Sequence, residues 1–427
     1  MDGKPGEARR WYFSPISPHA PWRLSLFTVE LTQQCNFRCS YCCFSGLYHD
    51  RRKHNALVMS EATMHDTVRF ILANRCPNRL TLVTFYGGEA LLAFDRMKTM
   101  VSTLRGKLGA DVGFSISTNG YALTPEVVDW IAGLPDCHVY VTLDGHREWH
   151  DLNRRTRGGL PTYDRILANL KHFKANYPAE YQERVGFLVT LRHWHQLIDV
   201  SDRWMANPFL SDKLPKHVSF ILPRTLEEML HPASPPDERR RVLDVAFQRY
   251  RSGEKSMLTQ QFVELTDQMH RTMQTLGPGN GIPGNGIPGN EIPKNEIEIR
   301  VSTCLEDLYR AFISTEGNVY ICERFGSGHA IGHVREGRLD RLRLEGMEQA
   351  FIDRRNRRCT QCEAAVLCRI CLTAANYTDT ELDALCHTER ATVKLLQEFA
   401  WQRRMFDRSQ QLLQPTLIPQ PPSEGGA

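Results

Sequence analysis

The chain has 427 residues, of which 41% are hydrophobic and 24% are charged, and this composition is typical of a soluble globular protein with two or three domains. The net charge of +4 is small for this length and does not favour nucleic-acid binding. No apolar run reaches the roughly 18 residues that cross a bilayer, and the amino-terminal residues lack the apolar core of a signal peptide. The sequence therefore predicts a cytoplasmic protein with no membrane and no nucleic-acid partner.

Six short apolar and β-branched runs alternate with helix-like stretches along the first half of the chain. This alternation predicts an α/β fold with a parallel sheet, whose functional loops follow the carboxyl ends of the strands. The predicted strands are residues 24–31, 80–85, 112–117, 138–143, 185–191 and 218–222. Ser60 is expected to cap the first intervening helix. The core-facing stripe of that helix is expected to be Met64, Val68, Ile71 and Leu72.

Changes in composition predict how the chain is divided. A five-residue repeat rich in Gly, Asn, Ile and Pro cannot sustain a helix or a strand, so it is expected to connect two domains. The predicted segments are an amino-terminal extension (1–23), a core (24–225), a helical segment (226–278), the repeat linker (279–298), a cysteine-rich domain (299–404) and a Pro-rich tail (405–427).

Thirteen cysteines are unusual in a cytosolic protein, where disulfides do not persist, and clustered cysteines there are more often metal ligands. Cys35, Cys39 and Cys42 follow the first predicted strand with the spacing CxxxCxxC. Three thiolates can hold three irons of a four-iron, four-sulfur cluster, which leaves the fourth iron open. A zinc site completed by a distant histidine would give the same spacing.

A second motif, Gly87, Gly88 and Glu89, ends the second predicted strand. Glycines let a backbone approach a ligand closely, and a neighbouring carboxylate can bind an ammonium group. A simple turn is the alternative interpretation of this triplet when it is taken alone.

Together the two motifs resemble those of the radical S-adenosylmethionine (SAM) enzymes, which have a partial (β/α)6 TIM-like barrel. The resemblance implies that the three cysteines bind a [4Fe–4S] cluster whose open iron binds SAM, and that reductive cleavage of SAM gives a 5′-deoxyadenosyl radical. It also implies that Tyr41 lies along the adenine. The methionine amine would be held by Gly87, Gly88 and Glu89.

Two more strand ends resemble the peptide-modifying branch of this family. The segment Ser117-Thr-Asn119-Gly follows the third strand, and Thr142-Leu-Asp144-Gly follows the fourth, before a His-Asp-Leu-Asn-Arg run that ends at Arg154. The resemblance implies that Thr142 and Arg154 engage the cofactor's carboxylate, a task that suits the guanidinium fork. Ser117, Asn119 and Asp144 would assist, although turn formation and strand-end capping explain these three equally well.

Seven further cysteines lie in the last third of the chain, and zinc would be the default ligand for them alone. They are Cys304, Cys322, Cys359, Cys362, Cys368, Cys371 and Cys386. In company with the upstream motifs they resemble a SPASM domain, which binds two auxiliary [4Fe–4S] clusters. The resemblance assigns Cys359, Cys362, Cys368 and Cys386 to the second auxiliary cluster. It assigns Cys304, Cys322 and Cys371 to the first, which would retain an open iron, although the short spacing from Cys368 to Cys371 departs from the family pattern.

The remaining candidates carry less information. Glu323 occupies the position of an acidic residue proposed as a catalytic base in sulfatase-maturing relatives, and a solvated glutamate is the alternative. Cys43, Cys76 and Cys137 are expected to be ordinary small side chains, with Cys43 pointing away from the cluster. The basic run from Arg51 is expected to be a solvated loop, with steering of an acidic substrate as the alternative.

The resemblance spans residues 24 to about 404 and implies a maturase that abstracts hydrogen from a ribosomally synthesised peptide, forming a thioether or another side-chain cross-link. The implied partners are a precursor peptide and an electron donor such as flavodoxin or ferredoxin. Because only 34 residues precede Cys35, a leader would be recognised by a separate protein, by the helical segment, or not at all. The alternatives are a sulfatase-maturing enzyme that produces formylglycine and a non-catalytic iron–sulfur or zinc protein that binds peptides.

Overall fold

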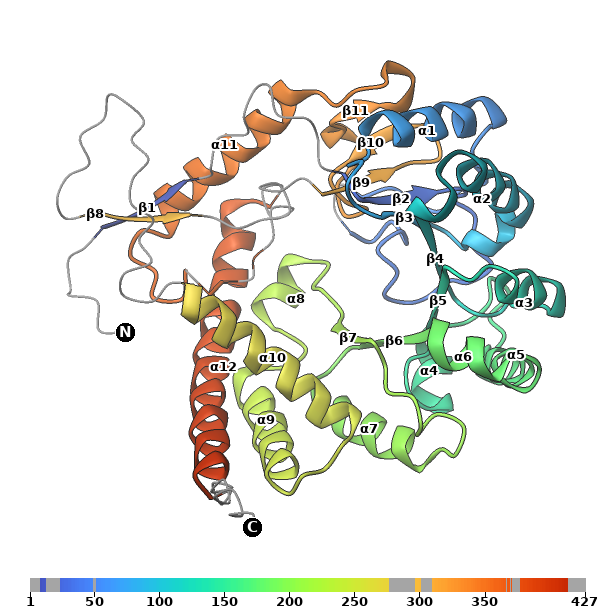
Figure 1. Ribbon diagram of the computed structural model, residues 1–427. Helices are drawn as coiled ribbons and strands as arrows, with labels where there is room; N and C mark the ends of the chain where they lie inside the picture. Colours follow the sequence, from blue (N-terminus) through green and yellow to red (C-terminus); the bar gives the residue numbers. More distant parts are fainter. Residues whose placement is uncertain are drawn as a thin grey trace, which may run out of the picture.

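The computed structural model describes residues 8–12, 24–48, 51–275, 296–300, 309–365, 367–368, 370 and 377–413. Within these residues the main feature is a nine-stranded sheet with the order β11-β10-β9-β2-β3-β4-β5-β6-β7. Figure 1 shows its strands in a curved row that is open on one side. A separate parallel pair joins β1 (Ala8–Tyr12) to β8 (Glu296–Arg300).

Six neighbouring strands of the large sheet run parallel and follow one another in chain order. They are β2 (Leu26–Glu30), β3 (Thr81–Tyr86), β4 (Val112–Thr118), β5 (Cys137–Thr142), β6 (Val185–Leu191) and β7 (His217–Phe220). Each overlaps a strand predicted from the sequence, and the ends differ by two residues at most. The nearly continuous burial of β4 is typical of a parallel strand that is covered on both faces.

Helices connect successive strands and cover the outer side of the row, which confirms the predicted partial barrel (Figure 1). Ser60 caps α1 by accepting a hydrogen bond from the Thr63 amide, and Met64, Val68 and Ile71 are buried as expected. The connecting helices are α1 (Glu61–Asn74), α2 (Phe94–Leu108), α3 (Pro125–Ala132), α4 (Arg147–Asn153), α5 (Tyr163–Asn176), α6 (Pro178–Arg184) and α7 (Gln196–Ala206).

The cysteine-rich part of the chain adds three strands directly to the β2 edge of the barrel sheet, which the sequence analysis did not anticipate. They are β9 (Arg310–Ile313), parallel to β2, and the antiparallel strands β10 (Asn318–Tyr320) and β11 (Gly332–His333). Thr315, in the turn after β9, donates hydrogen bonds to the buried Glu30 carboxylate through its amide (3.1 Å) and its hydroxyl (2.9 Å). Arg52 forms an ion pair with the same carboxylate, so this junction is charge-balanced.

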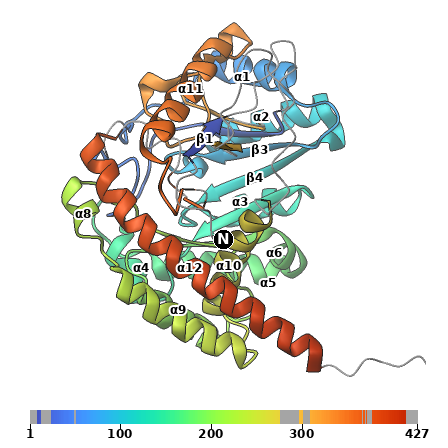
Figure 2. The ribbon, with the colours of Figure 1, turned by 90° about the vertical axis from the view of Figure 1, so that its left-hand side faces the viewer.

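Helices after the barrel form a second packed group, which consists of α8 (Leu226–Leu230), α9 (Pro236–Arg251), α10 (Met257–Thr275) and α12 (Asp379–Leu413). Helix α11 (Arg341–Arg358) is not part of this group and contacts β1 instead. Helix α12 packs against α8, α9 and α10 and crosses the open side of the molecule (Figure 2). Among the described helices, none is both long enough and apolar enough to cross a membrane.

Two predicted boundaries fall differently in the structure. Helix α12 extends through residues 405–413, which the sequence analysis assigned to the Pro-rich tail, because Phe406 packs against Phe247 and Tyr250 of α9. Residues 296–298 of the predicted linker belong to β8. The rest of the repeat and residues 414–427 lie outside the described residues.

The burial of Cys137 gives a chemical test of the fold. Its side chain is fully buried at the start of β5, and burial raises the pKa of its thiol to about 12. We therefore expect iodoacetamide to leave Cys137 unmodified in the folded protein, because the thiolate is the reactive form. Peptide mass spectrometry should show faster labelling of the half-buried Cys76 and equal labelling after unfolding. Equal rates at the two cysteines before unfolding would contradict this packing.

Candidate functional site

One open cavity, with an empty volume of about 1330 Å³, lies at the carboxyl ends of the parallel strands. Nearly all the barrel residues singled out from the sequence line it, and Glu323 joins them from the segment after β10. The singled-out residues that line the cavity are Cys35, Cys39, Tyr41, Cys42, Gly87, Gly88, Glu89, Ser117, Asn119, Thr142, Arg154 and Glu323. Asp144 is not among the residues that line it.

The loop that carries the three amino-terminal cysteines is held by the segment that follows α4. The Arg38 amide donates to the Arg155 carbonyl (2.9 Å), and the Ser40 amide donates to the Asn153 carbonyl (2.9 Å). The Ser40 hydroxyl also bonds the Asn153 side chain (2.7 Å). The His-Asp-Leu-Asn-Arg run therefore supports the cysteine loop in addition to supplying Arg154.

The surroundings of Cys35, Cys39 and Cys42 keep their thiols protonated when no metal is bound. Burial raises the pKa of Cys35 to about 12 and that of Cys39 to about 11, and the other thiolates nearby add to the rise. The hydrogen bond with Cys43, followed by burial, raises the pKa of Cys42 to about 12. Metal ions reverse such shifts, because a coordinated thiol loses its proton. The donor set therefore fits an iron–sulfur cluster with one open iron, as three thiolates require.

His54 lies beside the cysteine loop, and its Nε2 is 3.3 Å from the Cys42 sulfur. A histidine with three cysteines is a zinc ligand set. Among the described residues, however, no three ligand atoms of Cys35, Cys39, Cys42 and His54 lie within 4.8 Å of one another. The spacing of these side chains therefore favours a cluster over a single zinc ion.

The glycines after β3 permit a close backbone contact with the residues that lead into the cysteine loop. The Gly88 amide donates to the Thr32 carbonyl (3.0 Å), and the Glu89 amide donates to the Gln34 carbonyl (2.7 Å). A Cβ atom on Gly88 would lie 1.9 Å from the Gln34 carbonyl oxygen, so no other residue fits there. The two motifs are thus physically joined.

The Glu89 carboxylate is buried and held by three donors. It accepts hydrogen bonds from the Thr118 hydroxyl (2.7 Å), the Asn119 amide (2.8 Å) and the Leu91 amide (3.1 Å). Burial nevertheless raises its pKa. A carboxylate has about four acceptor positions, so one remains for a ligand such as an ammonium group. The sequence analysis missed Thr118, although a hydroxyl at the end of β4 was the available signal.

Arg154 is buried beside Tyr41 and keeps an unused donor. Its Nη1 donates to the Tyr41 hydroxyl (2.7 Å), whereas its Nε has no hydrogen-bond partner in the described part of the chain. A buried guanidinium nitrogen without a partner is costly, which favours a ligand carboxylate at this position. The structure therefore supports a ligand-binding role for Arg154.

Asp144, which the sequence analysis expected to assist in cofactor binding or to cap the strand end, contacts Tyr41 and is not among the residues that line the cavity. Its carboxylate accepts hydrogen bonds from the Tyr41 hydroxyl and from the Thr190 amide (2.9 Å). Its amide is bonded to the buried His150 ring (3.2 Å). Burial raises the pKa of Asp144, and Arg154 opposes that rise. Asp144 orients Tyr41, whose hydroxyl also binds Arg154.

Three smaller predictions have separate outcomes. Ser117 and Thr142 both line the cavity. Asn119 also lines it, but its side chain is engaged by the protein: it donates to Asn36 (2.7 Å) and accepts from the Tyr121 amide (3.0 Å). Asn119 thus connects the cysteine loop to the end of β4.

The expected orientation of Cys43 is wrong, because Cys43 lines the same cavity together with Glu323 and Tyr86. A hydrogen bond from Cys42 lowers the pKa of Cys43. Burial, and after it the neighbouring Cys43 and Glu323, raises the pKa of Tyr86 well above its usual value. The Glu323 side chain is 30% exposed and lies 3.8 Å from Arg324. Glu323 is therefore placed where it can reach a ligand in the cavity.

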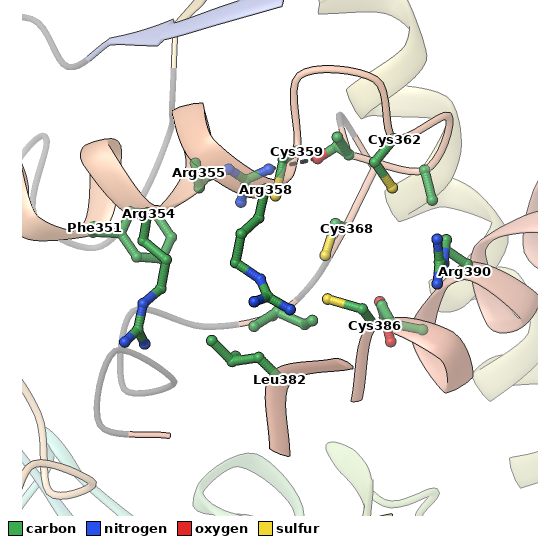
Figure 3. A pocket seen from close by; sticks show the side chains of 14 residues that line it. Phe351, Arg354, Arg355, Arg358, Cys359, Cys362, Cys368, Leu382, Cys386 and Arg390 are labelled. Atoms are coloured by element: carbon green, nitrogen blue, oxygen red, sulfur yellow. Dashed lines mark hydrogen bonds between the residues drawn. The ribbon is translucent and has the colours of Figure 1, made fainter. Parts of the chain in front are cut away.

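A second site gathers four cysteines from the end of α11, the loop after it and α12. Cys359, Cys362, Cys368 and Cys386 line a cavity of about 620 Å³, and their side chains face a common space (Figure 3). Burial raises the pKa of Cys368 to about 11 and raises the pKa of Cys359 and Cys386. Four such thiols are the ligand set of an iron–sulfur cluster or of a structural zinc ion. No three of these four sulfur atoms, all of them in described residues, lie within 4.8 Å of one another, which favours the larger cluster.

Arginines surround this four-cysteine site, and Arg355, Arg358 and Arg390 all line its cavity. They oppose the rise in the pKa values of the neighbouring thiols, as expected for groups that balance a negatively charged centre. Cys322 lies elsewhere, buried directly after β10. Cys304 and Cys371, predicted ligands of the first auxiliary cluster, lie outside the described residues.

The backbone contact at Gly88 makes a specific prediction. We expect Gly88→Ala to lower the free energy of unfolding of the cluster-free protein by about 3 kcal/mol or more, because the added Cβ must displace the Gln34 backbone. Gly106→Ala in α2 is the matched control, since nothing lies within 4 Å of its Cβ position. The control should stabilise the protein by about 0.4–1 kcal/mol. Urea unfolding measures both changes, and equal stabilities would contradict the contact.

Comparisons with known proteins agree with this geometry. The model of the radical SAM superfamily matches residues 29–200. A serine-type anaerobic sulfatase-maturating enzyme of Bacteroides thetaiotaomicron is 28% identical over 194 residues, which cover 38% of this chain and 44% of that protein. A GTP 3',8-cyclase of Haemophilus influenzae is 27% identical over 151 residues, covering 35% and 41%. The alignments with these curated relatives thus span less than half of their length.

The solved structure of native anSMEcpe with bound AdoMet and Cp18Cys peptide is also similar. It superposes with a TM-score of 0.61 at 18% identity and covers 90% of this chain and 99% of its own. At this identity the likeness concerns the fold. The family match, the joined motifs and the cavity agree: residues 29–200 of this chain form a radical SAM domain.

Proposed function

We propose that this protein is a radical SAM enzyme that abstracts hydrogen from a side chain of a polypeptide substrate. The observation that carries the proposal is that one cavity is lined by the three cysteines, by Glu89 and Arg154, and by a further carboxylate, Glu323. Its empty volume of about 1330 Å³ includes space that is open to solvent, and side chains of several strand ends and of the segment after β10 line it. We propose that a cofactor and part of a second molecule bind there together.

The chain's own residues would bind and orient the cofactor. Cys35, Cys39 and Cys42 would hold a [4Fe–4S] cluster, Glu89 would accept the amine of SAM, and the free Nε of Arg154 would face its carboxylate. When bound, these groups supply reductive cleavage of the sulfonium and a 5′-deoxyadenosyl radical. Tyr41, fixed by Asp144 and Arg154, would close one side of the cofactor site.

A polypeptide substrate is supported by the comparisons. Several similar proteins are named sulfatase-maturating enzymes, and the anSMEcpe structure contains a bound peptide. We propose that the product is a thioether or another side-chain cross-link. Oxidation of a Cys or Ser side chain to formylglycine is the second candidate, favoured by the position of Glu323. A carboxylate in the cavity can take the proton that leaves an oxidised substrate radical.

The four-cysteine site would serve either product as an auxiliary [4Fe–4S] centre that accepts the electron released with that proton. The other auxiliary cluster depends on Cys304 and Cys371, outside the described residues, and remains a prediction. The electron donor, the leader-binding protein and the cytoplasmic location also remain predictions.

An anaerobic activity assay tests the proposal. The reconstituted protein, dithionite and SAM should release 5′-deoxyadenosine, and Cys39→Ala should abolish this release because the cluster loses one of its three ligands. Candidate peptides carrying Cys or Ser are then analysed by mass spectrometry. A hydrazine-reactive aldehyde indicates formylglycine, whereas the loss of two hydrogens without an aldehyde indicates a cross-link. No 5′-deoxyadenosine above the Cys39→Ala background would favour a non-catalytic binding protein.

The role of Glu323 has a separate test. We expect Glu323→Gln to release 5′-deoxyadenosine at the wild-type rate while product falls at least about 100-fold, since positioned acid–base groups contribute roughly 10²–10⁴-fold. Glu316→Gln, at an exposed carboxylate in the turn before β10, is the matched control. Chromatography of 5′-deoxyadenosine and mass spectrometry of the peptide measure the two steps. A proportional loss of both would assign Glu323 to cofactor binding instead.

A further inference from the structure

Two histidines and a glutamate meet on the surface away from the cysteine sites. His193 and His195 lie in the turn between β6 and α7, and Glu238 lies in the first turn of α9. One potential ligand atom from each lies within 4.8 Å of the other two. Residues far apart in the sequence thus present two imidazoles and a carboxylate to one point.

The local structure explains why the two rings lie together. Trp194, between them, is buried and stacks on Phe220 with ring centroids 4.8 Å apart. Its amide donates to the Ser234 hydroxyl (2.7 Å) in the loop before α9. With Trp194 directed inward, its two neighbours project outward on the same side, and their rings stack at 5.2 Å.

Hydrogen bonds orient the ligand atoms as metal sites require. His193 Nδ1 lies 2.8 Å from the Ala233 carbonyl and donates to it, so in the neutral ring Nε2 is the nitrogen left to bind a metal ion. Metal-binding histidines are commonly fixed by such a bond to a backbone carbonyl. Glu238 Oε1 accepts from the Ser234 hydroxyl (2.8 Å) and the His195 amide (3.1 Å), which holds the carboxylate against the turn.

A simple ion pair explains only part of this arrangement. His195 Nδ1 lies 3.2 Å from Glu238 Oε1, as expected for an imidazolium beside a carboxylate. The ion pair of His195 with Glu238 does not explain why the His193 ring stacks on the His195 ring. Two imidazolium rings at this separation would repel each other, whereas two neutral rings can share a cation.

We propose that His193, His195 and Glu238 bind one divalent transition-metal ion of the zinc class. Two imidazoles and one carboxylate are ligands that zinc accepts, with a fourth position left for water. The His195 side chain is 56% exposed, so the ion can enter from solvent. This proposal is independent of the radical chemistry.

The ion would fasten parts of the molecule that form the large cavity. It would link the turn after β6 to α9, and Phe220, which stacks on Trp194, lines that cavity. Helix α9 is in turn bound to α12 by the ion pair of Arg240 with Glu398 (2.7 Å). The ion would therefore act as a structural clamp between the turn after β6 and α9.

The test uses the iron-reconstituted protein, so that the cysteines are occupied by iron. Wild-type protein, His193→Gln and Glu238→Gln are dialysed anaerobically against buffered Zn²⁺, and zinc and iron are counted by mass spectrometry. The wild type should hold one more zinc ion per chain than either variant, at unchanged iron content. We also expect Zn²⁺ to raise the melting temperature of the wild type alone.

His172→Gln is the matched control, because this half-buried histidine on α5 contacts only Asn176 among the interactions described for it. It should bind zinc as the wild type does. His195→Gln, at the exposed ring, replaces any variant whose iron content shows that it misfolds, and it should weaken zinc affinity roughly tenfold or more. Equal zinc content and equal melting shifts in the wild type and in all folded variants would overturn the proposal.

Discussion

The close approach of the Gly88 backbone to that of Gln34 holds the candidate active site together. It lets the loop after β3 donate two backbone hydrogen bonds to the chain that enters the cysteine loop. A side chain on Gly88 would separate the two segments, and Glu89 would then lose its position relative to the thiols. The position of the Glu89 carboxylate relative to the cysteines thus depends on this backbone contact, which forms only because Gly88 has no Cβ atom.

The chemistry of the cavity depends on buried charges that the protein only partly balances. Glu89 and Asp144 are both buried, and burial raises both of their pKa values. The buried Arg154 opposes the rise of both pKa values. Its Nη1 donates to the Tyr41 hydroxyl, and its Nε has no hydrogen-bond partner among the described residues. An unpaired donor and a carboxylate with spare acceptor capacity are unfavourable in an empty pocket. They become favourable when a ligand carries both an amine and a carboxylate.

Strands β9, β10 and β11, from the carboxy-terminal part of the chain, extend the barrel sheet at its β2 edge. Strand β9 pairs with β2, and Thr315 binds the Glu30 carboxylate at the carboxyl end of β2. This junction brings Glu323 into the cavity from a position almost three hundred residues after the cysteine loop. Helix α12 then returns across the open side and carries Cys386 to the cysteines that follow α11.

The sequence alone determined the local features of this protein. Runs of apolar and β-branched residues placed the six barrel strands β2 to β7, and Ser60 marked the start of α1. Cysteine spacing singled out two groups of cysteines that the structure places in two cavities. These properties depend on near neighbours in the chain. Only the tertiary structure decided which residues meet. Four features depend on contacts between segments that are distant in the chain. Strand β9 pairs with β2, and the Thr118 hydroxyl donates to Glu89. Asp144 supports neighbouring residues, and Cys43 lines the cavity. Such contacts are set by packing and by the pairing of buried polar groups, which no local spacing in the sequence records.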